Sequence, residues 1–158
     1  MRDSHRNDFR SDRRPQSSQR LPRTPLDMKF LSSGYYSDAE KRKLREDLIK
    51  TEAEKLGKTF ATLKPELTST QLRKFFNEVR SLEERVAENF DEQKALILML
   101  KSKVAYSVGK KTSKTPKEFK DFIDVCIDRI NDEEDFDGFV KFFESVVGYF
   151  YYYKEGGV

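Results

Sequence analysis

Basic side chains recur at helical spacing in the stretch LTSTQLRKFFNEVRSLEERV, which begins at Leu67. On a helix, Arg73 and Arg80 share one stripe beside the apolar face, and Lys74 points away from the core. Cations arranged in this way can neutralise the phosphates of a nucleic acid without reading its bases. A charged helix face is also commonly no more than a solvated surface, so this stretch alone leaves both interpretations open.

A second basic cluster lies between residues 101 and 120, which hold seven Lys and one Glu. Lys101 begins the cluster, and Lys103 and Lys110 share a stripe on the predicted helix that Lys111 continues into the following linker. Residues 121–158 carry the opposite excess, with three basic and ten acidic side chains. The net charge of +3 therefore hides a strong polarity along the chain, and the basic half is the part that suits a polyanion.

The acidic segment EEDFDGFVKFFE, residues 133–144, suggests a different chemistry. Glu133, Asp135, Asp137, Gly138 and Glu144 fall at loop positions one, three, five, six and twelve of a calcium-binding EF-hand. The match has Glu at position one, where Asp is expected, and the loop would stand alone. The alternative to this calcium hypothesis is an acidic first turn that complements the dipole of a helix.

Other catalytic sites have little support in the sequence. The only Cys is Cys126 and the only His is His5, so neither a disulfide within the chain nor a Cys/His zinc site can form. Cys126 lies on an apolar helical face, where a core role is expected. A nuclease that binds metal through carboxylates alone stays open as a third hypothesis, although no carboxylates pair recognisably. We predict no cofactor, no metal site and no catalytic residue.

The elements that must position these residues are helices. Periodic apolar residues, start signals and stop signals predict an all-α, five-helix bundle. The predicted helices run from Ser37 to about Leu56, from Thr68 through Val86, from Asp91 to Gly109, from Thr115-Pro116 through Ile130, and from near Asp135 or Asp137 to Lys154. The first two begin with the capping boxes SDAE and TSTQ. The third is apolar all round at its centre, which predicts a place in the middle of the bundle.

Residues 1–30 are rich in Arg, Ser, Asp and Pro and poor in apolar side chains. We predict a disordered basic arm over residues 1–30 and a single helical-bundle domain over residues 31–158. The chain has no apolar run near the roughly 18 residues that a membrane span requires. We therefore expect a cytoplasmic protein with no membrane partner. The run YFYYY, Tyr149 to Tyr153, must expose some rings on a helix, and a neighbouring protein chain would cover them best.

Three motifs together resemble the Csm-type small subunit of type III-A CRISPR effector complexes. They are TSTQLRKFFNEV, LKSKVAYSVGKK and a closing F-x-x-F-x-x-F-F-E helix that ends at Glu144, and the resemblance spans Leu67 to Lys154. The family reads P-K-L-A-Y-x-x-G-R where this chain has Ser102 in place of Pro and Lys110 in place of Arg. Lys110 keeps the charge but lacks the bidentate fork of a guanidinium.

The resemblance implies a non-catalytic antiviral-defence protein that stacks in several copies and contacts guide RNA and target RNA, beside the other subunits of the Csm complex. A guide complex must accept any sequence, so its protein parts should read charge and shape while base pairing carries identity. The residues that we predict to bind RNA are Arg73, Lys74, Arg80, Lys101, Lys103, Lys110 and Lys111. The calcium-binding helical protein, with its loop at residues 133–144, is the alternative function.

Overall fold

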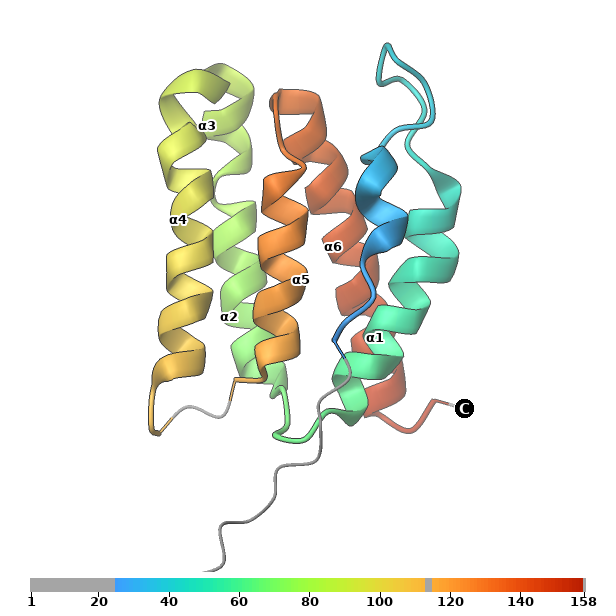
Figure 1. Ribbon diagram of the computed structural model, residues 1–158, viewed down its shortest axis with the longest axis vertical. Coiled ribbons are helices and arrows are strands. Elements are labelled where there is room, and N and C mark those ends of the chain that lie inside the picture. The colour runs from blue at the N-terminus through green and yellow to red at the C-terminus, as the bar shows by residue number, and fades with distance from the viewer. Residues whose placement is uncertain (1–24, 113–114, 158) are drawn as a thin grey trace, which may run out of the picture.

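The computed structural model describes residues 25–112 and 115–157, and this part of the chain is all-helical (Figure 1). The α-helices are α1 (Ala53–Thr62), α2 (Ser69–Arg80), α3 (Glu83–Glu88), α4 (Phe90–Gly109), α5 (Lys117–Asp128) and α6 (Glu133–Lys154). A 3₁₀-helix, η1 (Lys29–Ser33), and a π-helical segment, η2 (Leu48–Glu52), precede α1. The predicted all-α class is confirmed, with the second predicted helix divided into α2 and α3 by a turn at Ser81 and Leu82.

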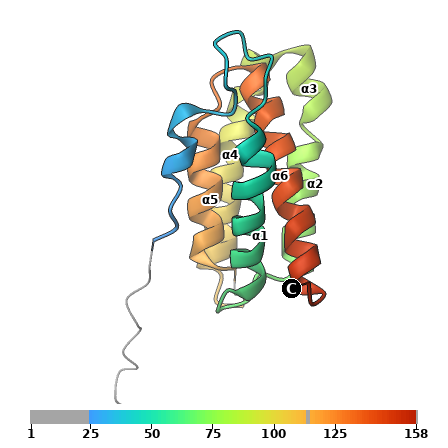
Figure 2. The ribbon, with the colours of Figure 1, turned by 90° about the vertical axis from the view of Figure 1, so that its right-hand side faces the viewer.

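The helices form a bundle in which α6 is central. α6 contacts α1, α2 and α3, whereas α4 packs on α5, α3 and α2. Figure 2 shows α1 beside α6, and Figure 1 places α4 at one edge of the bundle. The edge position of α4 contradicts the predicted central one, because Leu98 and Met99 are half exposed on its outer face.

Phenylalanine rings fill the core. Phe143 of α6 lies 5.2 Å from Phe76 of α2 and 5.5 Å from Phe122 of α5, measured between ring centroids. Phe75, the other member of the pair on α2, is buried and lies 5.4 Å from Phe119. The adjacent rings of Phe75 and Phe76 therefore both pack into the bundle. It fixes which side of α2 faces solvent, and so where the basic residues of α2 point.

Several residues that precede the predicted domain also pack on the core. Met28 is buried, and the Phe30 ring meets the Phe142 ring edge-on at 6.2 Å. Residues 1–24 of the predicted arm lie outside the described residues. The packed part of the chain thus begins within the segment that the composition assigns to the arm.

The segment of residues 34–45, which we call the strap, replaces the helix predicted to start at Ser37. The Asp38 carboxylate accepts hydrogen bonds from the backbone N–H groups of Arg42 (3.1 Å) and Lys43 (2.7 Å). The N–H of Ser37 donates to the carbonyl of Lys43 at 2.9 Å. These bonds satisfy the backbone in a turn, so the capping-box prediction at Ser37 is wrong and the helical run begins at Glu46.

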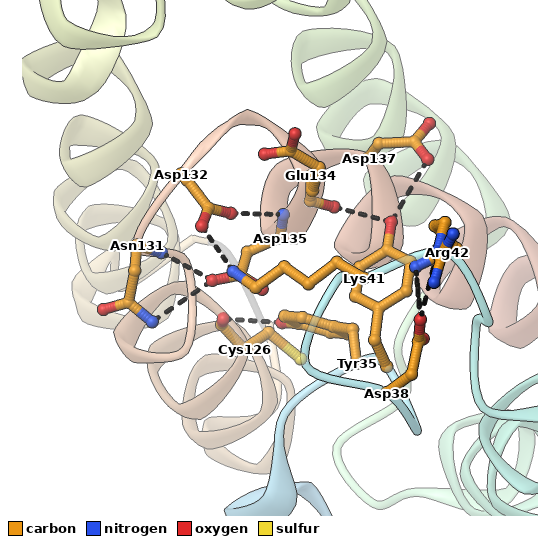
Figure 3. Close-up of polar contacts among 11 residues, drawn as sticks. Tyr35, Asp38, Lys41, Arg42, Cys126, Asn131, Asp132, Glu134, Asp135 and Asp137 are labelled. Carbon is orange, nitrogen blue, oxygen red and sulfur yellow. Dashed lines mark hydrogen bonds and ion pairs between the residues drawn. The ribbon is translucent and has the colours of Figure 1, made fainter.

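Two tyrosines, Tyr35 and Tyr36, anchor the strap to the bundle, and Figure 3 shows Tyr35 beside Cys126. The Tyr35 hydroxyl donates to the carbonyl of Cys126 at 2.6 Å, and the Tyr36 hydroxyl donates to the carbonyl of Glu134 at 2.7 Å. Both Tyr35 and Cys126 are fully buried. Burial raises the pKa of the Cys126 thiol well above its usual range, which keeps it neutral, as expected of a core residue.

Lys41 adds a charged anchor between the strap and the start of α6. Its ammonium group pairs with Asp132, the N-cap of α6, and lies 2.8 Å from the carboxylate of Asp135 (Figure 3). Asp135 is only 4% exposed and also accepts hydrogen bonds from the backbone N–H (3.0 Å) and the side-chain amide (3.2 Å) of Asn131. This buried carboxylate is thus fully engaged within the fold.

Candidate nucleic-acid interface

Three of the predicted RNA-binding residues meet in one groove between α2 and α4. Lys74 of α2 lines the groove together with Lys103 and Lys110 from the C-terminal half of α4 and its cap. The groove has a volume of about 320 Å³, and its apolar floor is formed by Phe75, Val104 and Phe119. We call it the α2/α4 groove.

A chain of hydrogen bonds holds the walls of the groove at one end. The predicted capping box begins α2, because the Thr68 hydroxyl accepts from the Gln71 N–H at 3.2 Å and the Gln71 side chain accepts from the Thr68 N–H at 2.9 Å. The Gln71 amide then donates to the Thr115 hydroxyl at 3.2 Å, just before α5. Thr115 in turn shares a hydrogen bond with Ser107 of α4 at 2.7 Å. This chain links the start of α2, the approach to α5 and the end of α4.

The α2/α4 groove is electropositive. Its lining holds three lysines and one carboxylate, that of Glu78. Lys103 lies 3.0 Å from a buried carboxylate oxygen of Glu78, and Lys74 is exposed. The excess of two positive charges in a concave surface favours an anionic ligand.

An aromatic ring completes the lining. Tyr106 is 68% exposed, and the Lys110 ammonium group lies over its ring, 4.5 Å from the centroid. A cation over an aromatic face is a favourable pair. Tyr106, Gln71 and Thr115 are not among the residues that the sequence predicted for the site. The sequence does indicate Tyr106, because it lies four residues before Lys110 at the end of a predicted helix and so on the same face.

The remaining predicted residues do not line this groove. Arg73 faces α6, where its Nε donates to the Tyr151 hydroxyl at 3.3 Å. Arg80 pairs with Glu83 at 2.9 Å and lies 4.0 Å from Glu144. The two arginines lie on the α6 side of α2 and so do not form one continuous positive surface with Lys103 and Lys110.

Lys101 and Lys111 also lie apart from the groove lining. Lys101 pairs with Asp128 of α5 at 2.7 Å. Lys111 is exposed directly after the groove residue Lys110. RNA contact by these two residues, and by Arg73 and Arg80, stays a prediction.

The acidic segment is a helix and not a calcium loop. Residues 133–144 form the first turns of α6, so their carboxylates cannot wrap around one ion as an EF-hand loop does. Glu133, Glu134 and Asp135 instead occupy the first turn, where they complement the helix dipole. Among residues 25–112 and 115–157, no three His, Cys, Asp or Glu side chains are grouped so that they could hold a metal ion.

The comparison with protein families decides the identity of this bundle. The family model described as Csm2 Type III-A matches residues 43–156, which include all six α-helices and the whole α2/α4 groove. The chain belongs to the Csm2 type III-A family. Its membership makes it a small subunit of a type III-A CRISPR Csm complex and confirms the resemblance drawn from the sequence motifs.

Searches of curated proteins and of solved structures found no match to the chain. Within the described part of this Csm2 family chain, no helix is both long and apolar enough to cross a membrane.

Proposed function

We propose that this small subunit binds the phosphate backbone of guide RNA and target RNA through the α2/α4 groove. The observation that supports the proposal most strongly is the convergence of Lys74 from α2 with Lys103 and Lys110 from α4 in one concave surface. Residues far apart in the sequence supply these charges, so only the folded bundle creates the site. In this proposal the subunit contributes binding and no catalysis.

Lysines are suited to such a role. An ammonium group neutralises a phosphate and releases its condensed counterions, and this gain is independent of base sequence. A subunit that acts on every guide needs this independence, because base pairing already supplies specificity. The lone carboxylate of Glu78, 3.0 Å from Lys103, holds that lysine in the groove when no phosphate is present.

We further propose that several copies stack in the complex and contact the other subunits through two different surfaces. Leu98 and Met99 expose apolar area on the outer face of α4, at one edge of the bundle. Tyr152 is half exposed near the end of α6, which packs along α1 at the other edge (Figure 1). Two unlike patches on separate elements permit a head-to-tail arrangement, which a filament requires.

The direct test is the salt dependence of RNA binding by a groove variant in which Lys74, Lys103 and Lys110 are all replaced by Ala. We expect the wild-type chain to bind a fluorescein-labelled RNA duplex with an affinity that falls steeply between about 50 and 200 mM salt. The groove variant should bind more weakly, and its slope of log affinity against log salt should be smaller by about 3, or one for each lysine removed. Fluorescence anisotropy measures both quantities.

A control variant of equal net charge separates the groove from general electrostatics. Lys29, Lys50 and Lys94 are exposed and do not line the groove, so their replacement by Ala removes the same charge elsewhere. We expect this variant to retain most of the wild-type affinity and slope. Equal losses in the two variants would contradict a site in the groove.

A further inference from the structure

The α2/α4 groove contains more than backbone binding requires. Lysines at its rim suit phosphates, but the floor of Phe75, Val104 and Phe119 is apolar, and Tyr106 presents a ring that is 68% exposed. A phosphate gains nothing from apolar or aromatic surface. The lining therefore fits a ligand that carries both negative charge and a flat apolar face.

Among the components of RNA, an unpaired nucleotide has this combination. In a duplex the faces of the bases are covered by their stacked neighbours, and the deep, narrow major groove keeps side chains from the bases. A base that has left the stack exposes two π-faces, and proteins hold such bases on aromatic side chains, next to cations that bind the flanking phosphates. The groove volume of about 320 Å³ lies at the small end of the range for ligand sites, which suits one nucleotide.

We propose that the α2/α4 groove holds one unpaired nucleotide of RNA, with its base against Tyr106 and the apolar floor and its flanking phosphates at Lys103 and Lys110. This inference rests on the proposed function and adds a ligand class to it. Lys74, on the opposite wall, faces the same space and can bind a second phosphate.

The placement of Lys110 supports this arrangement. Its ammonium group now covers the Tyr106 ring at 4.5 Å. The ammonium lies on a flexible, exposed stem, so it can move from the ring to a phosphate when a base takes its place. The ring lies at the groove because Tyr106 comes three residues after Lys103 and four before Lys110, on the same side of the helix end.

The test compares two RNA duplexes that differ only at a single bulged position. One duplex carries a bulged adenosine, and the other carries an abasic residue there, which preserves the backbone and the charge but removes the base. We expect the full-length wild-type chain to bind the bulged adenosine about tenfold more tightly, by fluorescence anisotropy, because one base is stacked in one complex and none in the other. Equal affinity for the two duplexes would overturn the inference.

Two substitutions of Tyr106 assign the effect to the ring. Tyr106→Ala should abolish the tenfold preference between the two duplexes, whereas Tyr106→Phe should retain it. A preference that survives Tyr106→Ala would also overturn the inference. Circular dichroism spectra that match the wild type will show that both variants fold, as expected for so exposed a side chain.

The same experiment tests the proposed function separately, through the salt dependence of binding to the two duplexes. Steep salt dependence with both duplexes, but no preference for the base, leaves backbone binding intact and removes only the nucleotide site. If neither duplex binds in a salt-dependent way, the proposed function fails and the inference fails with it.

Discussion

Lys41 shows how one side chain fixes a segment that local sequence would have made helical. Its backbone has a φ of +53°, in the left-handed region that non-glycine residues rarely adopt. The contacts of its ammonium group with Asp132 and Asp135 offset this strain, which costs about 1 kcal/mol for such a residue. The strap is thus held by interactions with α6 and not by its own propensity.

The ion pair between Lys41 and Asp132 makes the stability of the fold depend on pH. Burial opposes ionisation of Asp132, but the hydrogen bonds from Lys41 and from the backbone N–H of Asp135 prevail and lower its pKa. A carboxylate with a lowered pKa stabilises the fold above its unfolded pKa of about 4, and this contribution is lost as the pH falls through the folded value.

The substitution Asp132→Asn tests this pH dependence while it keeps a good N-cap for α6. We expect it to lower the free energy of unfolding at pH 7 by about 1 kcal/mol, a small value because the Asp132 side chain is 43% exposed. The difference from the wild type should shrink as the pH falls from 7 to about 2, because Asp132 of the wild type loses its charge as the pH passes through its lowered pKa. Urea unfolding at pH 7 and at about pH 2 measures the difference in free energy of unfolding. Glu88→Gln, which removes an exposed carboxylate, is the control.

A difference that persisted unchanged at low pH would show that Asp132 acts through something other than its charge.

Two capping-box patterns illustrate what the sequence can predict at this scale. TSTQ forms the predicted reciprocal hydrogen bonds between Thr68 and Gln71, and α2 begins as expected. SDAE at Ser37 has the same signature, but no helix begins there. The hydroxyl groups of Tyr35 and Tyr36 donate to carbonyl groups of distant residues and keep the strap non-helical. A local pattern cannot predict these contacts, because the partners lie more than 90 residues away in the sequence.

Gly57 determines how closely two helices of the bundle approach each other. The first predicted helix ends at about Leu56, yet α1 continues through Gly57 to Thr62. A Cβ atom at this position would lie 2.5 Å from the Cβ of Tyr149 and 2.7 Å from the backbone nitrogen of Phe150. The missing side chain therefore lets α1 lie directly against the backbone of α6.

We expect Gly57→Ala to lower the free energy of unfolding by about 1 kcal/mol. The clash involves backbone atoms of α6, which cannot move aside, and overpacking of this kind costs about 1–3 kcal/mol, more than the gain of about 1 kcal/mol in helix propensity. Gly148→Ala is the matched control within α6, because nothing lies within 4 Å of its added Cβ. That variant should be more stable than the wild type by about 0.5–1 kcal/mol.

Thermal unfolding of the two glycine variants measures both effects. Equal stability changes in the two would mean that close packing at Gly57 is unimportant.

The position of α4 could not be predicted from its composition. A helix that is apolar all round is normally buried, but α4 lies at the edge and exposes Leu98 and Met99. Its neighbours α5, α3 and α2 cover only one side. The extra apolar residues are consistent with a helix that another protein chain covers, as expected of a subunit in a complex.

On the scale of the whole molecule, helical spacing predicts part of the candidate site. Spacing places residues around their own helix, and it correctly groups Lys103 with Lys110 on α4. It does not reveal which side of α2 faces α4. The core packing of Phe75 and Phe76 turns Lys74 toward the groove, while Arg73 faces Tyr151 of α6.

The polarity of charge along the sequence is partly neutralised by the fold. Lys101, from the basic segment, pairs with Asp128 of the acidic segment at 2.7 Å. Arg80 is similarly engaged with Glu83 at 2.9 Å. The three groove lysines, by contrast, share a single carboxylate in the lining. Charge counted along the chain therefore overestimates the basic surface, whereas the groove lining keeps an excess of two positive charges.

Photo-crosslinking of the assembled Csm complex to target RNA that contains 4-thiouridine tests most directly whether RNA occupies the α2/α4 groove. Mass spectrometry of the digested small subunit identifies the peptides that carry RNA. Our account predicts crosslinks on the peptide of residues 104–110, which contains Tyr106 and the final turn of α4. Crosslinks confined to the tyrosines of residues 149–153, with none on residues 104–110, would contradict it.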